Sequence, residues 1–78
     1  AYNTADDLQQ YINLVIEKCN NFLEVPSNAS NALFSDISSY KNYLSSFDVS
    51  TLTYPMNINW EKYCEDNSIS YIHPLQIP

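Results

Sequence analysis

The chain contains no glycine in its 78 residues. Glycine supplies the backbone conformations on which tight β-hairpins, phosphate-binding loops and nucleophile elbows depend. A chain without glycine is therefore poorly suited to an all-β fold or a P-loop, and we expect an all-α domain. Left-handed helix ends, which glycine usually forms, should fall to asparagines such as Asn20, Asn21 and Asn67.

The clearest helical pattern lies in the first third of the chain. At 100° per residue, one arc of this segment collects the apolar side chains Leu8, Tyr11, Ile12, Val15, Ile16, Cys19, Phe22 and Leu23. Thr4 and Asp7 have the spacing of a capping box, and the acidic Asp6 and Asp7 suit the positive start of a helix. We predict an amphipathic helix over residues 5–23, with Cys19 facing inward.

A second helix is expected after the break at Pro26. Apolar residues then recur at alternating spacings of three and four: Ala29, Leu33, Ile37, Tyr40, Leu44 and Phe47. This pattern predicts a helix over residues 30–47. The short joint between the two helices favours an antiparallel hairpin.

The last third of the chain predicts a shorter helix followed by a strap. Asn57 or Asn59 can cap a helix in which Trp60, Tyr63 and Cys64 share one side. The tail over residues 69–78 holds two prolines among alternating apolar residues, so we expect it to cross the helices in extended form. The predicted architecture is a small three- to four-helix domain that occupies residues 1–78.

The two cysteines suggest how such a small domain is stabilised. A core of this size usually contributes only about 3–5 kcal/mol, so a covalent or quaternary staple is expected. Cys19 and Cys64 do not form a CxxC pattern, and the single His73 cannot complete a zinc site with them. We predict one Cys19–Cys64 disulfide. The alternative is a pair of buried free thiols in a cytosolic protein.

Three features favour secretion. The chain opens at Ala1 rather than at a methionine, so we expect that a leader has been removed. The run Asn28-Ala29-Ser30 is an acceptor sequon, which makes Asn28 a candidate for N-glycosylation. The predicted disulfide also suits an oxidising compartment. No apolar run is long enough to suggest a transmembrane segment.

Charge and residue types argue against several functions. Three lysines, no arginine and nine acidic residues give a net charge of −6, which opposes binding to nucleic acid and to anionic membranes. His73 is the only imidazole, and no strained turn or oxyanion donor accompanies it, so we expect no catalytic residue and no enzyme. The acidic pairs lack the pattern of an EF-hand. We therefore expect no metal and no cofactor.

The aromatic content is the one hint of binding. Seven Tyr, three Phe and one Trp exceed ordinary usage, and Tyr suits interfaces. Leu14 and Tyr43 fit the helical arcs poorly and are candidates for a partner surface. We expect a small secreted binding or effector-like protein that associates with a protein partner, as a homodimer or as one subunit of a processed complex, as in two-chain toxins. The alternative is a carrier that holds a fatty acid or sterol between its amphipathic helices.

Overall fold

Three α-helices and three short 3-10 helices make up the regular structure of the computed structural model, which describes all 78 residues. In chain order these are α1 (Ala5–Leu23), η1 (Pro26–Ser30), α2 (Phe34–Ser45), η2 (Val49–Thr51), α3 (Trp60–Asp66) and η3 (Pro74–Gln76). The only β-pairing is an isolated bridge between Tyr2 and Met56. The prediction of an all-α domain is confirmed.

Helix α1 has the predicted bounds because its ends are satisfied locally. At its start, the Asp7 amide donates to Thr4 Oγ1 over 3.2 Å. At its end, the Glu24 amide donates to the Asn20 carbonyl, and Asn28 Nδ2 donates to the Phe22 carbonyl over 2.8 Å. Carbonyls of the last turn thus find partners without a left-handed residue.

Helix α2 is shorter than predicted, because it begins at Phe34 rather than at residue 30 and ends at Ser45 rather than at residue 47. Pro26 does not only end the preceding pattern but also begins η1, where its fixed φ and missing amide are tolerated. Asn31 Oδ1 then accepts from the Leu33 amide over 2.8 Å, which forms a local turn in place of helix. The predicted core residue Ala29 is consequently exposed.

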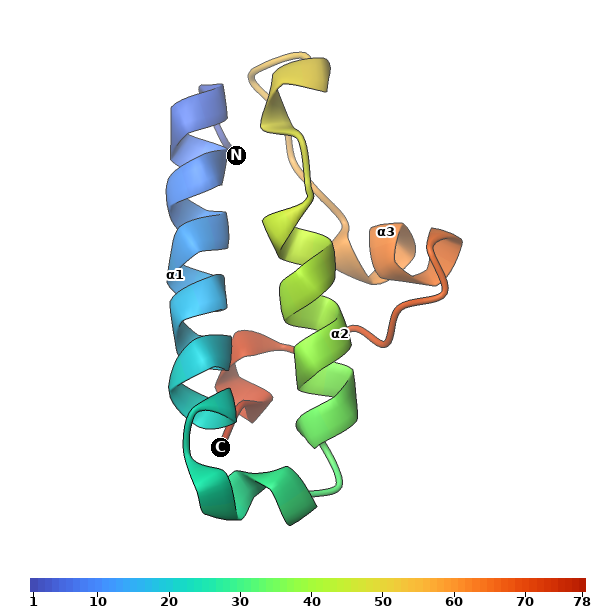
Figure 1. Ribbon diagram of the computed structural model, residues 1–78. Helices are drawn as coiled ribbons and strands as arrows, with labels where there is room; N and C mark the ends of the chain where they lie inside the picture. Colours follow the sequence, from blue (N-terminus) through green and yellow to red (C-terminus); the bar gives the residue numbers. More distant parts are fainter.

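The helices are arranged as an antiparallel pair with a third element against one side (Figure 1). Helices α1 and α2 run side by side. Helix α3 is drawn on the α2 side in Figure 1, and its Trp60 stacks with Tyr11 of α1 at a centroid distance of 6.4 Å. After α3 the chain returns past α2 to the lower half of α1, and Ile72 in this strap is buried. The strap is not extended throughout, because Pro74 begins η3 and His73 Nδ1 caps it by accepting from the Leu75 amide.

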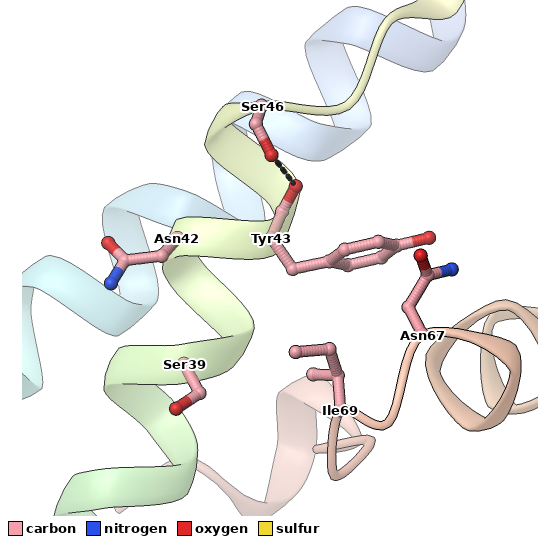
Figure 2. Close-up of a pocket in the computed structure, with 6 residues that line it drawn as sticks. All are labelled: Ser39, Asn42, Tyr43, Ser46, Asn67 and Ile69. Carbon is pink, nitrogen blue, oxygen red and sulfur yellow. Dashed lines mark hydrogen bonds between the residues drawn. The ribbon is translucent and has the colours of Figure 1, made fainter.

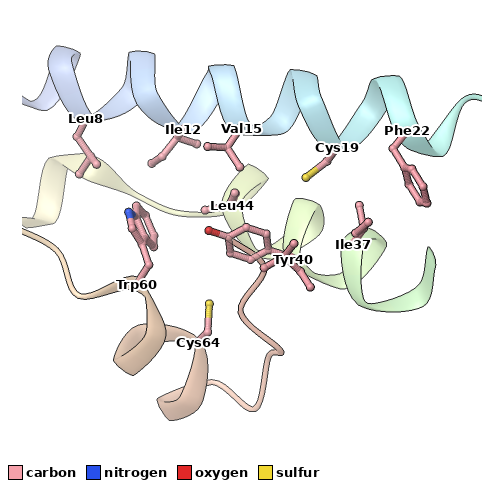
Figure 3. Packing of buried hydrophobic residues seen from close by; sticks show 11 residues of the cluster. Leu8, Ile12, Val15, Cys19, Phe22, Ile37, Tyr40, Leu44, Trp60 and Cys64 are labelled. Carbon is pink, nitrogen blue, oxygen red and sulfur yellow. The ribbon is translucent and has the colours of Figure 1, made fainter. Parts of the chain in front are cut away.

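The core is continuous and contains no buried charged residue. Its buried residues are Leu8, Ile12, Val15, Cys19, Phe22, Ile37, Tyr40, Leu44, Trp60, Cys64 and Ile72. Figure 3 shows α1 and α2 contributing most of this cluster, with Trp60 and Cys64 entering from α3. The predicted inward faces of α1 and α2 therefore supply the seam between them.

The predicted Cys19–Cys64 disulfide is wrong: both cysteines are buried free thiols. Burial raises the pKa of both thiols, and in the view of Figure 3 the ring of Tyr40 is drawn between the two sulfur atoms. The charges of both thiols contribute to the raised pKa of Tyr40, so the three side chains share one part of the buried core. Sulfur packed against an aromatic ring is itself a favourable contact, so the cysteines serve here as small core residues.

The end of α3 carries the chain's one left-handed residue, Ser68, at φ 57°. The Ile69 amide donates to the Cys64 carbonyl over 2.8 Å, and the Ser68 amide donates to the Glu65 carbonyl over 3.1 Å. This pair of bonds is a Schellman motif with serine in the position that glycine usually takes. The expectation that asparagine would take this conformation is wrong, since Asn67 lies one residue earlier at φ −107°.

Candidate functional site

A surface depression lies between α2 and the residues that end α3 (Figure 2). It has a volume of about 450 Å³, and its lining residues are Ser39, Asn42, Tyr43, Ser46, Asn67 and Ile69. A second depression of about 420 Å³ shares Tyr43, Ser46 and Asn67 with it, and its other lining residues are Phe47, Asp48, Thr51, Leu52 and Tyr63. We call the two together the Tyr43 groove.

One wall of the groove is the outward stripe of α2. Ser39, Tyr43 and Ser46 are spaced by four and three residues, so they line up along one side of the helix. The Ser46 hydroxyl donates to the Tyr43 carbonyl over 3.1 Å, as the dashed line in Figure 2 marks. The side chains of Ser39 and Asn42 make no hydrogen bond within the chain. The Ser39 hydroxyl and the Asn42 side-chain amide are therefore free to bond an external group.

The opposite wall is set by the Schellman end of α3. The left-handed Ser68 turns the chain so that Asn67 and Ile69, on either side of it, both line the groove. Asn67 Nδ2 donates to the Tyr63 carbonyl over 2.8 Å, which fixes the amide and leaves its oxygen unpaired. In Figure 2 this amide lies beside the hydroxyl end of Tyr43, above Ile69.

Aromatic rings form the base of the groove and join it to the core. Phe47 is in edge contact with Tyr43 at a centroid distance of 6.0 Å, and with the buried Trp60 at 5.2 Å. Tyr63 packs on Phe47 at 5.9 Å. Such ring pairs are restricted in geometry and lose little conformational freedom on binding, so the base of the groove is preorganised.

The electrostatics of the groove are acidic. Asp48 accepts hydrogen bonds from the Ser50 amide over 2.9 Å and the Ser50 hydroxyl over 2.6 Å, and these bonds hold its pKa below the usual value. Burial raises the pKa of Tyr43, with smaller contributions from Cys64, Tyr63 and Asp66. At neutral pH the groove therefore presents an ionised Asp48 and a protonated Tyr43.

The predicted partner-surface residues lie in different places. Tyr43 lines the groove, whereas Leu14, on α1, is 60% exposed and lines none of the depressions. The structure therefore does not place them in one binding site.

The other residues that the sequence singled out have roles in local structure. Asn28, the glycosylation candidate, is half-buried, and its amide nitrogen is already engaged with the Phe22 carbonyl. His73 caps η3 and lies outside the groove.

Other classes of site find no geometric support. No group of three or more His, Cys, Asp or Glu side chains is placed to hold a metal ion. None of the helices combines the length and the hydropathy that a membrane crossing requires.

The core hydroxyl of Tyr40 and the indole nitrogen of Trp60 are buried without hydrogen-bond partners.

Several groove residues were not predicted from the sequence. Ser39 and Ser46 are one turn from Tyr43 on either side, so helical spacing alone identifies them once Tyr43 is chosen. Asn67 and Ile69 come from a segment more than twenty residues away in the chain, and only the return of α3 against α2 brings them to Tyr43. No local pattern contains that information.

Comparison of the chain with known protein families, with curated protein sequences and with solved structures finds no match.

Proposed function

We propose that this protein is a small, non-enzymatic binding protein that associates with a protein partner through the Tyr43 groove. The observation that carries the proposal is the composition of the groove, where partly buried aromatic rings stand beside serine and asparagine side chains that have free hydrogen-bonding capacity. Tyrosine with serine and asparagine is the combination that adaptable protein-binding surfaces use.

The shape of the groove supports a protein partner over a small molecule. Its two depressions are open to solvent and extend along α2 from Ser39 to Phe47. Protein segments are recognised by shallow, elongated surfaces of this kind, whereas small apolar ligands require a concave site that buries most of their surface.

A carrier of fatty acids or sterols is less well supported. The interior between α1 and α2 is filled by side chains, of which Ile12, Ile37 and Tyr40 are fully buried. The three depressions lie at the surface and have mixed polar and apolar linings.

We propose secretion on the sequon at Asn28, and not on a disulfide. The free thiols of Cys19 and Cys64 no longer support an oxidising compartment. The sequon at Asn28 is still consistent with secretion. A loss of mass when protein from its natural source is treated with a glycosidase would support glycosylation there. A glycan takes one of the two hydrogens of Asn28 Nδ2, so the other must be the one that donates to the Phe22 carbonyl.

Site-specific photo-crosslinking tests the proposed association. A photoreactive phenylalanine analogue replaces Asn42 in the groove or, as the control, the exposed Gln10 on α1. In extracts of the producing source, we expect one dominant protein adduct from position 42, and its loss when Tyr43→Ala is added. Equal adducts from both positions, or an adduct from position 42 that is indifferent to Tyr43→Ala, would contradict the proposal.

A further inference from the structure

Three carboxylates surround the Tyr43 groove. Asp48 lines it beyond the end of α2, and Asp36 lies one turn before Ser39 on the same stripe of the helix. Asp66, in the last turn of α3, is close enough for its charge to act on Tyr43. Asp36 and Asp48 form no ion pair, whereas the charge of Asp66 is shared with Lys62, so the unpaired negative charge at the groove comes from α2 and the turn after it.

No unpaired cation lies at the groove. Lys62 pairs with Asp66 over 3.2 Å, and neither lines the depressions. Lys41 is two residues from Tyr43, about 200° around the helix, and its charge acts on Cys19 of α1. The remaining lysine, Lys18, is on α1 and lines the separate depression with Ile77 and Pro78.

We propose that the Tyr43 groove binds a cationic, arginine- or lysine-bearing segment of its protein partner, and not a second copy of this chain. The inference rests on the proposed function and adds the chemistry of the partner. Two copies that met at this groove would oppose acidic rims on chains that each carry a net charge of −6. Like charges brought together across an interface weaken association, whereas opposite charges increase its rate and specificity.

The residues of the groove match such a segment. A guanidinium or ammonium group can stack on the faces of Tyr43 and Tyr63, which attract cations. The Ser50 amide and hydroxyl both donate to Asp48 Oδ1, which orients the carboxylate and leaves Oδ2 free to accept from a cation. Asn42 and Ser39 supply neutral donors and acceptors for the backbone of the segment.

An amide NMR titration with designed peptides tests the inference on the whole chain. The probe is a short peptide with arginine at every second position, compared with versions that carry glutamine or glutamate at those positions. We expect the arginine peptide to shift the amides of residues 39–48 and 67–69, and to bind at least about tenfold more tightly than the glutamate version. Tyr43→Ala should weaken its binding by at least about tenfold.

Matched charge variants separate the groove from the overall charge. Asp48→Asn with Asp36→Asn should weaken the arginine peptide about threefold to tenfold, whereas Glu17→Gln with Glu24→Gln, on α1 and its cap, should leave it within about twofold. Asparagine retains the capping oxygen of Asp48, so the fold is preserved. Equal weakening by both pairs, or no shift at the groove at peptide concentrations on the order of millimolar, would overturn the inference.

The outcomes also separate the inference from the proposed function. If the glutamine peptide binds in the groove as tightly as the arginine peptide and both depend on Tyr43, the preference for cations is wrong but the groove remains a protein-binding surface. If position 42 also gives no Tyr43-dependent adduct with a partner, the proposed function fails as well.

Discussion

Helix α2 has two faces, and they differ in how fully they are buried. On the seam with α1, Ile37, Tyr40 and Leu44 are almost completely inaccessible to solvent. On the groove side, Tyr43 and Phe47 are only half-buried, and Ser39 and Ser46 are exposed. One helix therefore supplies both the core and a wall of the groove, and its aromatic rings are fully buried on the first side and only partly buried on the second.

The largest expected difference concerns stability. Ile12→Ala removes a fully buried side chain from the seam, so it should lower the free energy of unfolding by about 2–5 kcal/mol. Leu14→Ala, two residues along the same helix, should change it by at most about 0.5 kcal/mol because Leu14 is 60% exposed. Urea unfolding of both variants measures the contrast, and similar losses would refute the assignment of the seam.

Alkaline pH should weaken the seam. Burial raises the pKa of the thiols of Cys19 and Cys64, and raises that of Tyr40 far more. These groups therefore lose their protons more readily in the unfolded chain. Their stabilising contribution is complete below the pKa of an unfolded thiol, about 8.5. Above that pH, the free energy of unfolding falls by up to about 1.4 kcal/mol per pH unit for each thiol.

Urea unfolding at a series of pH values measures this loss. A variant that combines Cys19→Ala with Cys64→Ala should be less stable at neutral pH because of the cavities it leaves, but its stability should fall less steeply above pH about 8.5. Identical slopes for the two proteins would show that the thiols do not contribute.

Removal of single hydroxyls should separate the two faces of α2. The Tyr40 hydroxyl is buried without a partner, so Tyr40→Phe should leave stability unchanged or raise it by about 1 kcal/mol. Tyr43→Phe should leave stability unchanged, because its hydroxyl is at the solvent-facing groove, but it should weaken partner binding. Thermal unfolding and a binding titration measure the two effects, and a loss of more than about 1 kcal/mol in Tyr40→Phe would reveal a hidden partner for that hydroxyl.

A smaller gain in stability is expected at the end of α3. Ser68 holds a left-handed conformation that glycine adopts without steric cost, so Ser68→Gly should stabilise the chain by about 0.5–1 kcal/mol. Ser70→Gly is the control, since Ser70 does not have positive φ, and it should be neutral or destabilising. Urea midpoints compare the two, and the opposite order would contradict the backbone geometry of this turn.

Reduction should have no effect at all. Because Cys19 and Cys64 are free, a reducing agent should change neither the mass of the protein nor its unfolding midpoint. A thiol reagent should label the folded chain slowly and both cysteines rapidly after unfolding, since both are buried. A mass increase of two hydrogen atoms on reduction would show that Cys19 and Cys64 are bonded after all.

The seam was largely predictable from the sequence, because it depends on local periodicity. The bounds of α1 and its Thr4 cap followed from the spacing of apolar residues and from capping chemistry. The cap of α3 at Asn59 was one of two candidates, and the structure selects it by a bond from the Lys62 amide to Asn59 Oδ1. The start of α2 was missed because Asn31 offers the backbone a competing turn.

The disulfide and the groove were beyond the reach of local patterns. Sequence distance and the expected need of a small domain for a staple suggested that Cys19 and Cys64 are bonded, but both are free thiols in the same buried core as Tyr40. Tyr43 was identified by its poor fit to that stripe. Its partners Asn67 and Ile69 depend on the tertiary position of α3, which no spacing rule contains.

We expect association through the groove side of α2, and not through the exposed face of α1. Amide hydrogen exchange of the chain alone and in complex with its partner tests this most directly. The account predicts slower exchange on binding at residues 39–48 and 67–69, with little change at residues 10–17 around Leu14. Slower exchange confined to residues 10–17 would contradict it and would place the partner on α1.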